Sequence, residues 1–204
     1  LLVHGLGSNC LTWEAVAQRL AAAGHAVVTV DQRGHGLSDK PDSGYDFATV
    51  AGDLAALIRQ LGLERPVVAG QSWGGNVVLA FGVHHPGLAH GLCFVDGGFL
   101  DLQSRSLNGS GPTWEEMRQR LAPPPLDGMR LEELRARIRA ANPEWSEWGV
   151  EAMLHNLEHL PDGTVRRRLP LAQHQTIIRA LWDQRPPQLY AKVQEPVLVC
   201  PAED

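Results

Sequence analysis

The sequence has few cysteines, few aromatic residues and no long hydrophobic run. Its three cysteines, Cys10, Cys93 and Cys200, are too few and too far apart for a disulfide framework. Cys93 and Cys200 lie in strand-like apolar segments, so we expect buried thiols and a reducing compartment, the cytoplasm. No apolar segment approaches the roughly 20 residues that a membrane helix needs, so we expect no membrane association.

Basic residues are also scarce. The 18 lysines and arginines are outnumbered by 23 acidic residues, which disfavours nucleic acid as a partner. The one basic run, residues 166–168, is expected to be a solvated face. The sequence has no H-E-x-x-H motif and no paired-cysteine spacing, so we expect no metal and no organic cofactor. A small-molecule substrate is the expected partner, and the oligomeric state is left open.

Both ends of the sequence resemble the middle of a buried strand. Residues 1–3 are apolar and have neither an initiator methionine nor a turn before them, and residues 196–204 run through another strand and stop. A domain rarely ends in this way, because an unpaired central strand exposes its backbone groups. We therefore expect a fragment that lacks sequence at both ends.

Short apolar segments alternate with helical segments through the first half of the chain. They are apolar at every position, as in parallel strands that are covered on both faces. The alternation predicts an α/β fold with a doubly wound, mostly parallel sheet. The predicted strands are residues 1–3, 27–30, 67–69, 92–95 and 197–200, and the predicted helices between the first four begin at Thr12, Ala48 and the residue after Ser72.

The pattern changes between the fourth and the fifth strand. This stretch has several helical segments and no convincing strand, and a capping box at Thr113 and Glu116 begins the first of its helices. We interpret it as a helical cap inserted into the core. The predicted units are a core part at 1–99, the cap at 100–191 and a return to the core at 192–204.

The most informative motif lies at residues 70–74, which have the sequence GQSWG. A G-x-S-x-G turn between a strand and a helix holds its serine on a strained corner, with the hydroxyl exposed above the edge of the sheet. Here an apolar strand precedes the motif and an apolar helix follows it. We therefore predict that Ser72 is a nucleophile.

A second glycine-containing loop follows the first strand. There the N–H of Leu6, together with that of Trp73, is predicted to form an oxyanion hole beside the serine. His4 in the same loop is expected to brace it through hydrogen bonds. A dinucleotide site is the rival interpretation, since Gly5 and Gly7 precede an acidic residue at the end of the second strand. The third glycine of that motif is missing, however, because position 10 is a cysteine.

The second strand leads into a polar loop at residues 31–38 with the sequence DQRGHGLS. We expect Arg33 and Asp31 to pair and brace this loop, while its glycines permit sharp turns. His35 lies between two glycines, and we expect a structural role for it.

These motifs occur in the order and spacing of the α/β-hydrolase superfamily, which the whole chain resembles. The resemblance rests on His4-Gly5 after a strand, on the loop from Asp31 to Ser38 with Pro41, and on the Ser72 turn. The turn is similar to those of epoxide hydrolases and haloalkane dehalogenases, which carry aspartate where this chain has serine. That departure counts against these two activities. A serine followed by tryptophan is also similar to proline iminopeptidases, esterases and C–C bond hydrolases.

The resemblance implies a triad in the order serine, acid, histidine. The acid is implied after the last strand, where Asp204 matches best and Glu203 second, and Asp96 after the fourth strand is an alternative. The histidine is implied beyond residue 204, because all nine histidines precede the last strand. His155, His159 and His174 fall in the cap, where at most they contact the substrate.

The sequence thus predicts a serine hydrolase that acts on a carbonyl substrate of the ester type. This fragment alone is expected to be inactive, because without the histidine the serine stays a weak nucleophile. A C–C bond hydrolase or a cofactor-free peroxidase on the same fold is an alternative, and so is a ligand-binding member without catalytic activity.

Overall fold

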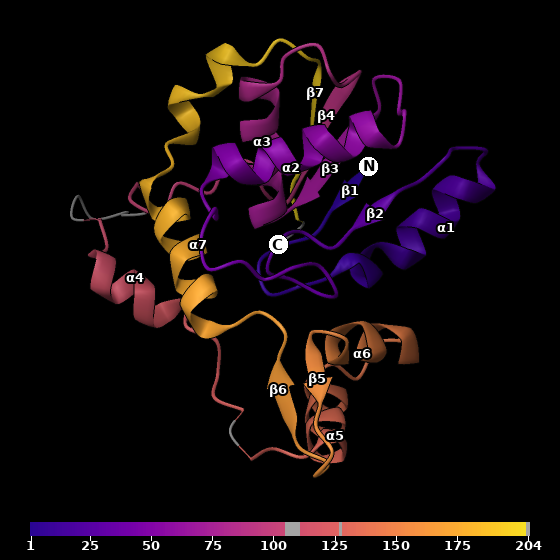
Figure 1. The fold of residues 1–204 in the computed structure, drawn as a ribbon, viewed down its shortest axis with the longest axis vertical. Coiled ribbons are helices and arrows are strands. Elements are labelled where there is room, and N and C mark those ends of the chain that lie inside the picture. Colours follow the sequence, from indigo (N-terminus) through magenta and orange to yellow (C-terminus); the bar gives the residue numbers. More distant parts are fainter. Residues whose placement is uncertain (105–110, 127, 203–204) are drawn as a thin grey trace.

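A computed structural model describes residues 1–104, 111–126 and 128–202. Its centre is a five-stranded parallel sheet in the order β2-β1-β3-β4-β7 (Figure 1). All five predicted strands are present and the doubly wound sheet is confirmed, although the first two strands are shorter than expected. The strands are β1 (Leu2–Val3), β2 (Thr29–Val30), β3 (Val67–Gln71), β4 (Gly91–Val95) and β7 (Val197–Cys200).

Helices cover both faces of the sheet because the side chains of each strand alternate between two apolar layers. Along β1, Val3 packs in the layer of α2 and α3, whereas Leu2 packs with Trp13 and Leu20 in the layer of α1. The helices are α1 (Glu14–Ala22), α2 (Phe47–Gln60) and α3 (Trp73–His84).

The first helix does not begin at Thr12 as predicted. A 3₁₀ helix at Cys10–Trp13 precedes α1, and Asn9 caps it, since its Oδ1 accepts a hydrogen bond from the N–H of Leu11. The hydroxyl of Thr12 donates to the carbonyl of Asn9 instead. Asparagine is a stronger N-cap than threonine, which agrees with the capping role of Asn9.

The segment between β4 and β7, here called the insertion, contains four helices in its described part. Thr113 and Glu116 form the predicted capping box at the start of α4. Two of the helices, α4 and α7, pack on the main core, and short 3₁₀ helices at Pro186–Gln188 and Tyr190–Lys192 lead on to β7. The helices are α4 (Trp114–Arg120), α5 (Leu131–Ala141), α6 (Glu147–Leu154) and α7 (Leu171–Asp183).

The insertion also contains two strands, contrary to the prediction. β5 (Leu157–His159) and β6 (Val165–Arg167) pair as an antiparallel hairpin. Helix α6 ends at Leu154, so Leu157 lies in β5 and not in a helical segment. The strands escaped detection because each has three residues and two of these are charged or polar, too few to display an apolar pattern.

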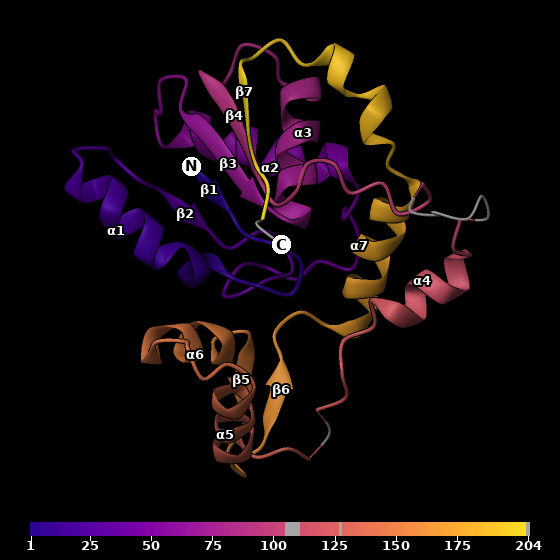
Figure 2. The same cartoon turned by 180° about the vertical axis from the view of Figure 1, so that it is seen from behind.

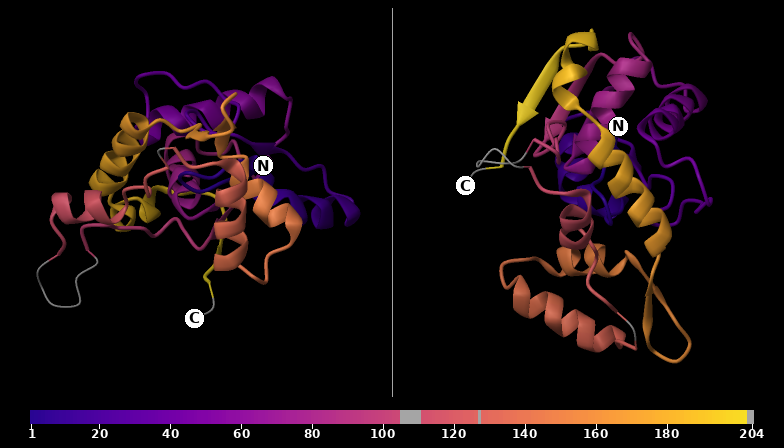
Figure 3. Two further views of the ribbon diagram at one scale, coloured as in Figure 1. Left: turned by 90° about the horizontal axis from the view of Figure 1, so that it is seen from below. Right: turned by 90° about the vertical axis from the view of Figure 1, so that its left-hand side faces the viewer.

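Helices α5 and α6 and strands β5 and β6 form an outer lobe with its own small apolar cluster, built on Ile138, Val150, Leu154, Leu157 and Val165. The outer lobe lies beyond the carboxyl ends of the sheet strands, as the front and back views show (Figures 1 and 2). Seen from below, it lies in front of the sheet (Figure 3). Asn9 ties it to the core, because its Nδ2 donates to the carbonyl of Ala152 and to Asn156 Oδ1, both at 2.7 Å.

Candidate active site

Ser72 lies between β3 and α3 in a conformation that few residues adopt. Its φ is 54° and its ψ is −124°, a region that costs of order 1–3 kcal/mol for a residue with a side chain. Its N–H donates to the carbonyl of Val95 at 3.0 Å, which ties the turn to the end of β4. The residue is half-buried, so the corner at the carboxyl edge of the sheet is reached from outside.

The glycines around Ser72 are required by close contacts. A Cβ at Gly70 would lie 2.2 Å from the carbonyl oxygen of Gly74, and one at Gly74 would lie 2.5 Å from that of His4. One at Gly97, which follows β4, would lie 2.2 Å from the carbonyl oxygen of Ser72 itself. The neighbours are all backbone atoms of the sheet and the turn, so no side chain can move aside. Only glycine therefore fits at these positions around the serine.

Two backbone N–H groups near the serine have no acceptor in the described part of the chain. One belongs to Trp73, the first residue of α3, and the other to Leu6 in the loop after β1. This loop approaches the turn closely, since a Cβ at Gly5 would lie 3.3 Å from the Cβ of Ser72. Free amides beside a serine hydroxyl are the arrangement that an oxyanion hole needs.

His4 braces the loop, as expected. It is fully buried, its Nε2 accepts a hydrogen bond from the N–H of Gln32, and its Nδ1 donates to the carbonyl of Gly5 at 2.7 Å. Burial lowers the pKa of His4 to about 4, against the smaller opposing effects of the Gly5 carbonyl and of Asp31. Both ring nitrogens are engaged with backbone, so His4 is not available as a base.

His35 is structural for the same reason. Its Nε2 accepts from the N–H of Gly7 and its Nδ1 donates to the carbonyl of Arg33, both at 3.1 Å. Its ring stacks on that of Trp73 with the centroids 5.4 Å apart, and burial lowers its pKa to about 3. This histidine connects the loop of Leu6 to the helix of Trp73, and these are the two residues that carry the free amides.

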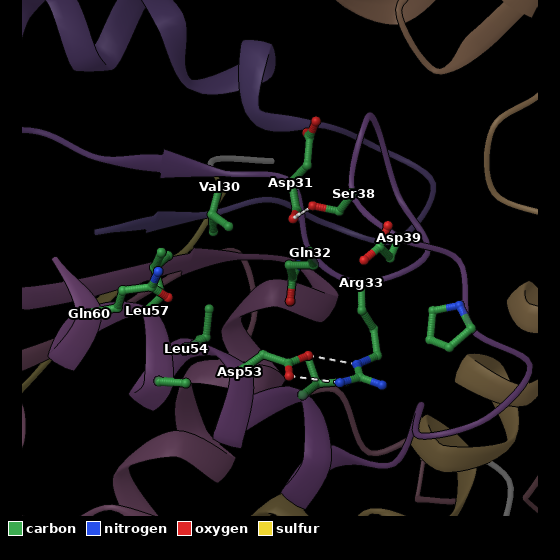
Figure 4. A pocket seen from close by; sticks show the side chains of 13 residues that line it. Val30, Asp31, Gln32, Arg33, Ser38, Asp39, Asp53, Leu54, Leu57 and Gln60 are labelled. Atoms are coloured by element: carbon green, nitrogen blue, oxygen red, sulfur yellow. Dashed lines mark hydrogen bonds and ion pairs between the residues drawn. The ribbon is translucent and has the colours of Figure 1, made fainter.

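The predicted pair of Arg33 and Asp31 does not form. Arg33 instead makes a bidentate ion pair with Asp53 on α2, with distances of 2.6 and 2.7 Å (Figure 4). Asp31 accepts hydrogen bonds from the N–H groups of Cys10 and Leu37. Burial alone would raise the pKa of Asp31, but these two bonds outweigh it and the pKa lies below its usual value. With both oxygens occupied, Asp31 is not free to bind a ribose, and the dinucleotide interpretation loses its acidic residue.

The acid of the site has three candidates. Asp204 and Glu203 lie outside the described residues. Asp96 directly follows β4, where its φ is 45° and its N–H donates to the carbonyl of Cys200. Its side chain is exposed and takes part in no hydrogen bond within the described residues, which is typical of a turn residue.

A buried amide network that sequence analysis missed holds α3 to the segments around it. Asn76 Oδ1 accepts from the N–H groups of Gly98 and Leu100, and its Nδ2 donates to the carbonyl of Leu100 and to Gln184 Oε1. Gln184 follows α7 and returns a bond to the backbone of Asn76. The only signal for this network in the sequence is a polar residue in an otherwise apolar helix.

Two cavities lie near these elements. The larger, about 580 Å³, runs between β2 and α2 and is lined by residues such as Val30, Asp53 and Leu57 (Figure 4). Neither Ser72 nor the two free amides line it, so we assign it no part in the site.

The smaller cavity has a volume of about 190 Å³ and lies where the Leu6 loop meets the insertion. We call it the His174 cavity. Its lining includes Leu6, His35, Asn156, Arg167, Arg168 and His174.

Within residues 1–104, 111–126 and 128–202, no group of three or more histidine, cysteine or acidic side chains is arranged to hold a metal ion. None of the helices in those ranges combines the length and apolar character needed to cross a bilayer.

Known proteins share this architecture. A solved structure of E-2-(acetamidomethylene)succinate hydrolase superposes with a TM-score of 0.73 over 97% of this chain and 70% of its own, at 24% identity. The 2-(acetamidomethylene)succinate hydrolase of Mesorhizobium japonicum is 36% identical over 96 residues, 47% of this chain and 34% of that protein. Epoxide hydrolase B of Mycobacterium tuberculosis is 31% identical over 112 residues, 54% of this chain and 32% of that protein.

The matched segments thus span about a third of the length of these curated relatives. A family model described as the alpha/beta hydrolase fold matches residues 1–188. The chain belongs to the α/β-hydrolase fold family.

Proposed function

We propose that the protein is a serine hydrolase that cleaves a small carbonyl substrate of the ester type, with Ser72 as its nucleophile. The observation that carries this proposal is the conjunction of a strained, accessible Ser72 with the free N–H groups of Leu6 and Trp73. Strain of this kind persists only where the surroundings enforce it, and the close backbone contacts of Gly70, Gly74 and Gly97 enforce it here.

In the proposed reaction, the Ser72 hydroxyl attacks the substrate carbonyl while a histidine accepts its proton. The N–H groups of Leu6 and Trp73 stabilise the oxyanion of the tetrahedral intermediate, and each such donor contributes roughly 3–4 kcal/mol to lowering the barrier. The leaving group departs with a proton from the histidine, and water then releases the acyl group by the reverse sequence.

The proposal takes the histidine from sequence beyond residue 204. Asp204 is the first choice for the acid that orients it, with Glu203 second and Asp96 as the alternative at the end of β4. His4 and His35 are excluded as bases because both nitrogens of each ring are bonded to backbone groups.

Residues 100–191 are proposed to act as the cap of this site. They supply the wall of the His174 cavity that faces the Leu6 loop. The similarity to 2-(acetamidomethylene)succinate hydrolase supports a small-molecule substrate with a hydrolysable carbonyl.

A fluorophosphonate probe tests the proposal on protein expressed from the whole reading frame. Ser72 should be labelled, and Ser72→Ala should remove the label. Ser43→Ala is the matched control, because Ser43 is exposed in a loop and the structure uses only its carbonyl. Folded protein that takes no label at Ser72 would count against a hydrolase and in favour of the ligand-binding alternative.

A substrate panel separates the enzymatic alternatives. Aryl esters should be hydrolysed, whereas a C–C bond hydrolase would prefer vinylogous diketones. A cofactor-free peroxidase would instead halogenate a dye in the presence of hydrogen peroxide and bromide.

A further inference from the structure

The His174 cavity carries two arginines that form no ion pair within the described ranges. Arg167 and Arg168 both line it, and neither is among the ion pairs found there. Arg167 donates to the carbonyl of Pro124, and Arg168 donates to that of His155 at 3.1 Å. The carbonyls position the two guanidinium groups. Glu158 partly balances the charge of Arg168, which helps to lower the pKa of this glutamate, whereas Arg167 has no acidic partner within the described ranges.

The side chains of Arg166 and Arg167 point to opposite faces of the hairpin. In β6, Arg166 points outward, with 65% of its side chain exposed, and pairs with Glu158. Arg167 follows it on the opposite face of the strand, where it is half-buried and lines the cavity. Burial lowers the pKa of Arg167, which means that its charged form lacks the stabilisation that an anion would provide.

His174 lines the same cavity and carries a buried polar atom without a partner. The residue lies in the first turn of α7 and is only 7% exposed, and its Nδ1 has no hydrogen-bond partner in the part of the chain described. Burial is the main cause that lowers the pKa of His174 to about 4, and the charge of Arg167 adds to it. A buried ring nitrogen without a partner destabilises the folded protein, and a bound ligand that pairs with it would remove this cost.

We propose that the His174 cavity binds a carboxylate group of the substrate, with Arg167 as the counter-ion and His174 as a hydrogen-bond donor. This inference rests on the proposed function, because it is Leu6 that connects the cavity to the reaction. Leu6 lines the cavity, and in the proposed reaction its N–H binds the oxyanion. The substrate class is therefore a small ester or amide that carries a free acid close to the bond that is cleaved.

Size and shape favour a carboxylate. The cavity holds about 190 Å³, less than the roughly 300–1,000 Å³ of a site for a drug-sized molecule. It therefore takes one end of a small substrate. The planar fork of a guanidinium group matches the two oxygens of a carboxylate, and the uncharged imidazole supplies one N–H alongside.

Matched substrates test the proposal on protein from the whole reading frame. The readout is the ratio of kcat/KM for the 4-nitrophenyl monoester of succinic acid to that for its methyl-capped, uncharged counterpart. We expect a ratio of about ten or more, and Arg167→Met should bring it close to one, as expected for a charge-assisted hydrogen bond worth at least a factor of ten.

Arg166→Met is the matched control, because it removes the same charge one residue away from a side chain that points to solvent. It should keep the wild-type ratio. A wild-type ratio near one overturns the proposal, and so does a high ratio that survives in Arg167→Met.

A binding measurement keeps the test independent of turnover. Succinate should bind the Ser72→Ala protein in a calorimetric titration, and its affinity should fall at least about tenfold when Arg167→Met is added. If the protein hydrolyses no ester but shows this pattern, the proposed function fails and the carboxylate site stands. If esters are hydrolysed but succinate does not bind, the carboxylate site is wrong and the serine hydrolase stands.

Discussion

The main core and the outer lobe both contribute to the candidate site, but they are held together in different ways. Among the described residues, the largest apolar cluster joins the sheet with α2, α3, α4 and α7 and contains 23 buried residues, whereas the cluster of the outer lobe has five. Ion pairs supplement the small cluster, as between Arg135 of α5 and Glu151 of α6. The first part can hold a strained serine in place, and the second has far less apolar burial to resist opening.

The residues of the candidate site also come from these two parts. Ser72, Leu6 and Trp73 all come from the main core, where misplacement of a reacting group is most harmful. Arg167 comes from the outer lobe and, in our proposal, contacts a part of the substrate that does not react. In our proposal the part that buries more apolar surface is the rigid catalytic one, and the part that buries less is the one that recognises the substrate.

One isoleucine in each part allows the same substitution to be compared. Ile58 in α2 is fully buried, and Ile58→Ala should lower the free energy of unfolding by about 4–5 kcal/mol, near the upper end for such changes. Ile138 in α5 is 9% exposed, and Ile138→Ala should cost about 2–3 kcal/mol, because the small lobe can relax around the gap. Urea denaturation measures both, and equal losses would contradict the comparison.

Low pH should weaken the main core through its buried histidines. His4 and His35 have pKa values of about 4 and about 3 in the folded protein, below the value of about 6.5 in an unfolded chain. As the pH falls below 6.5 the unfolded chain binds protons that the folded one cannot, so the free energy of unfolding decreases. The expected loss is about 2 kcal/mol per histidine between pH 6.5 and 5.

Urea denaturation at several pH values checks this. The free energy of unfolding should begin to decrease well above pH 4. The carboxylates whose pKa is lowered, such as Asp31, start to contribute only near pH 4. His35→Gln should reduce the slope between pH 6.5 and 5, and a slope unchanged by the substitution would show that this histidine is not the cause.

The features that the sequence predicts correctly are those determined by neighbouring residues. The strands are short apolar runs and the turn at Ser72 is a five-residue motif, so each could be identified from neighbouring residues alone. Ion pairs and hydrogen bonds between residues far apart in the chain could not be predicted in this way. Arg33 was assigned to the nearby Asp31, but Asp53 on α2 can align both carboxylate oxygens with the guanidinium group.

The sequence alone also could not predict that Arg167 lines the His174 cavity. Arg167 was expected to be solvated because it belongs to a basic run, and only the pairing of β5 with β6 turns it inward. Three-residue strands have no pattern of their own, so neither the hairpin nor the direction of Arg167 can be obtained without the fold. The strands and the turn of the main core were therefore predictable, whereas the long-range pairs of the main core and the hairpin of the outer lobe were not.

The contact between the two parts can be weakened by one substitution. Asn9→Ser keeps an oxygen that can cap the 3₁₀ helix but removes the two hydrogen bonds to Ala152 and Asn156. We expect the free energy of unfolding to decrease by about 1–2 kcal/mol, because the two acceptors lose their hydrogen-bond donor. Amide hydrogen exchange should accelerate in residues 147–157 and stay unchanged in α2, and equal acceleration in both would mean that the whole fold had been weakened.

The smallest effect is expected for an exposed ion pair of the outer lobe. Arg137 and Glu133 lie one turn apart on α5, with 62% and 50% of their side chains exposed. Water screens such a pair and ordering two long side chains opposes it, so Arg137→Ala should change the free energy of unfolding by only about 0.3–0.5 kcal/mol. Raising the salt concentration should shrink even this difference. A loss above about 1 kcal/mol in urea denaturation would mean that surface charge, and not its five-residue cluster, holds the outer lobe together.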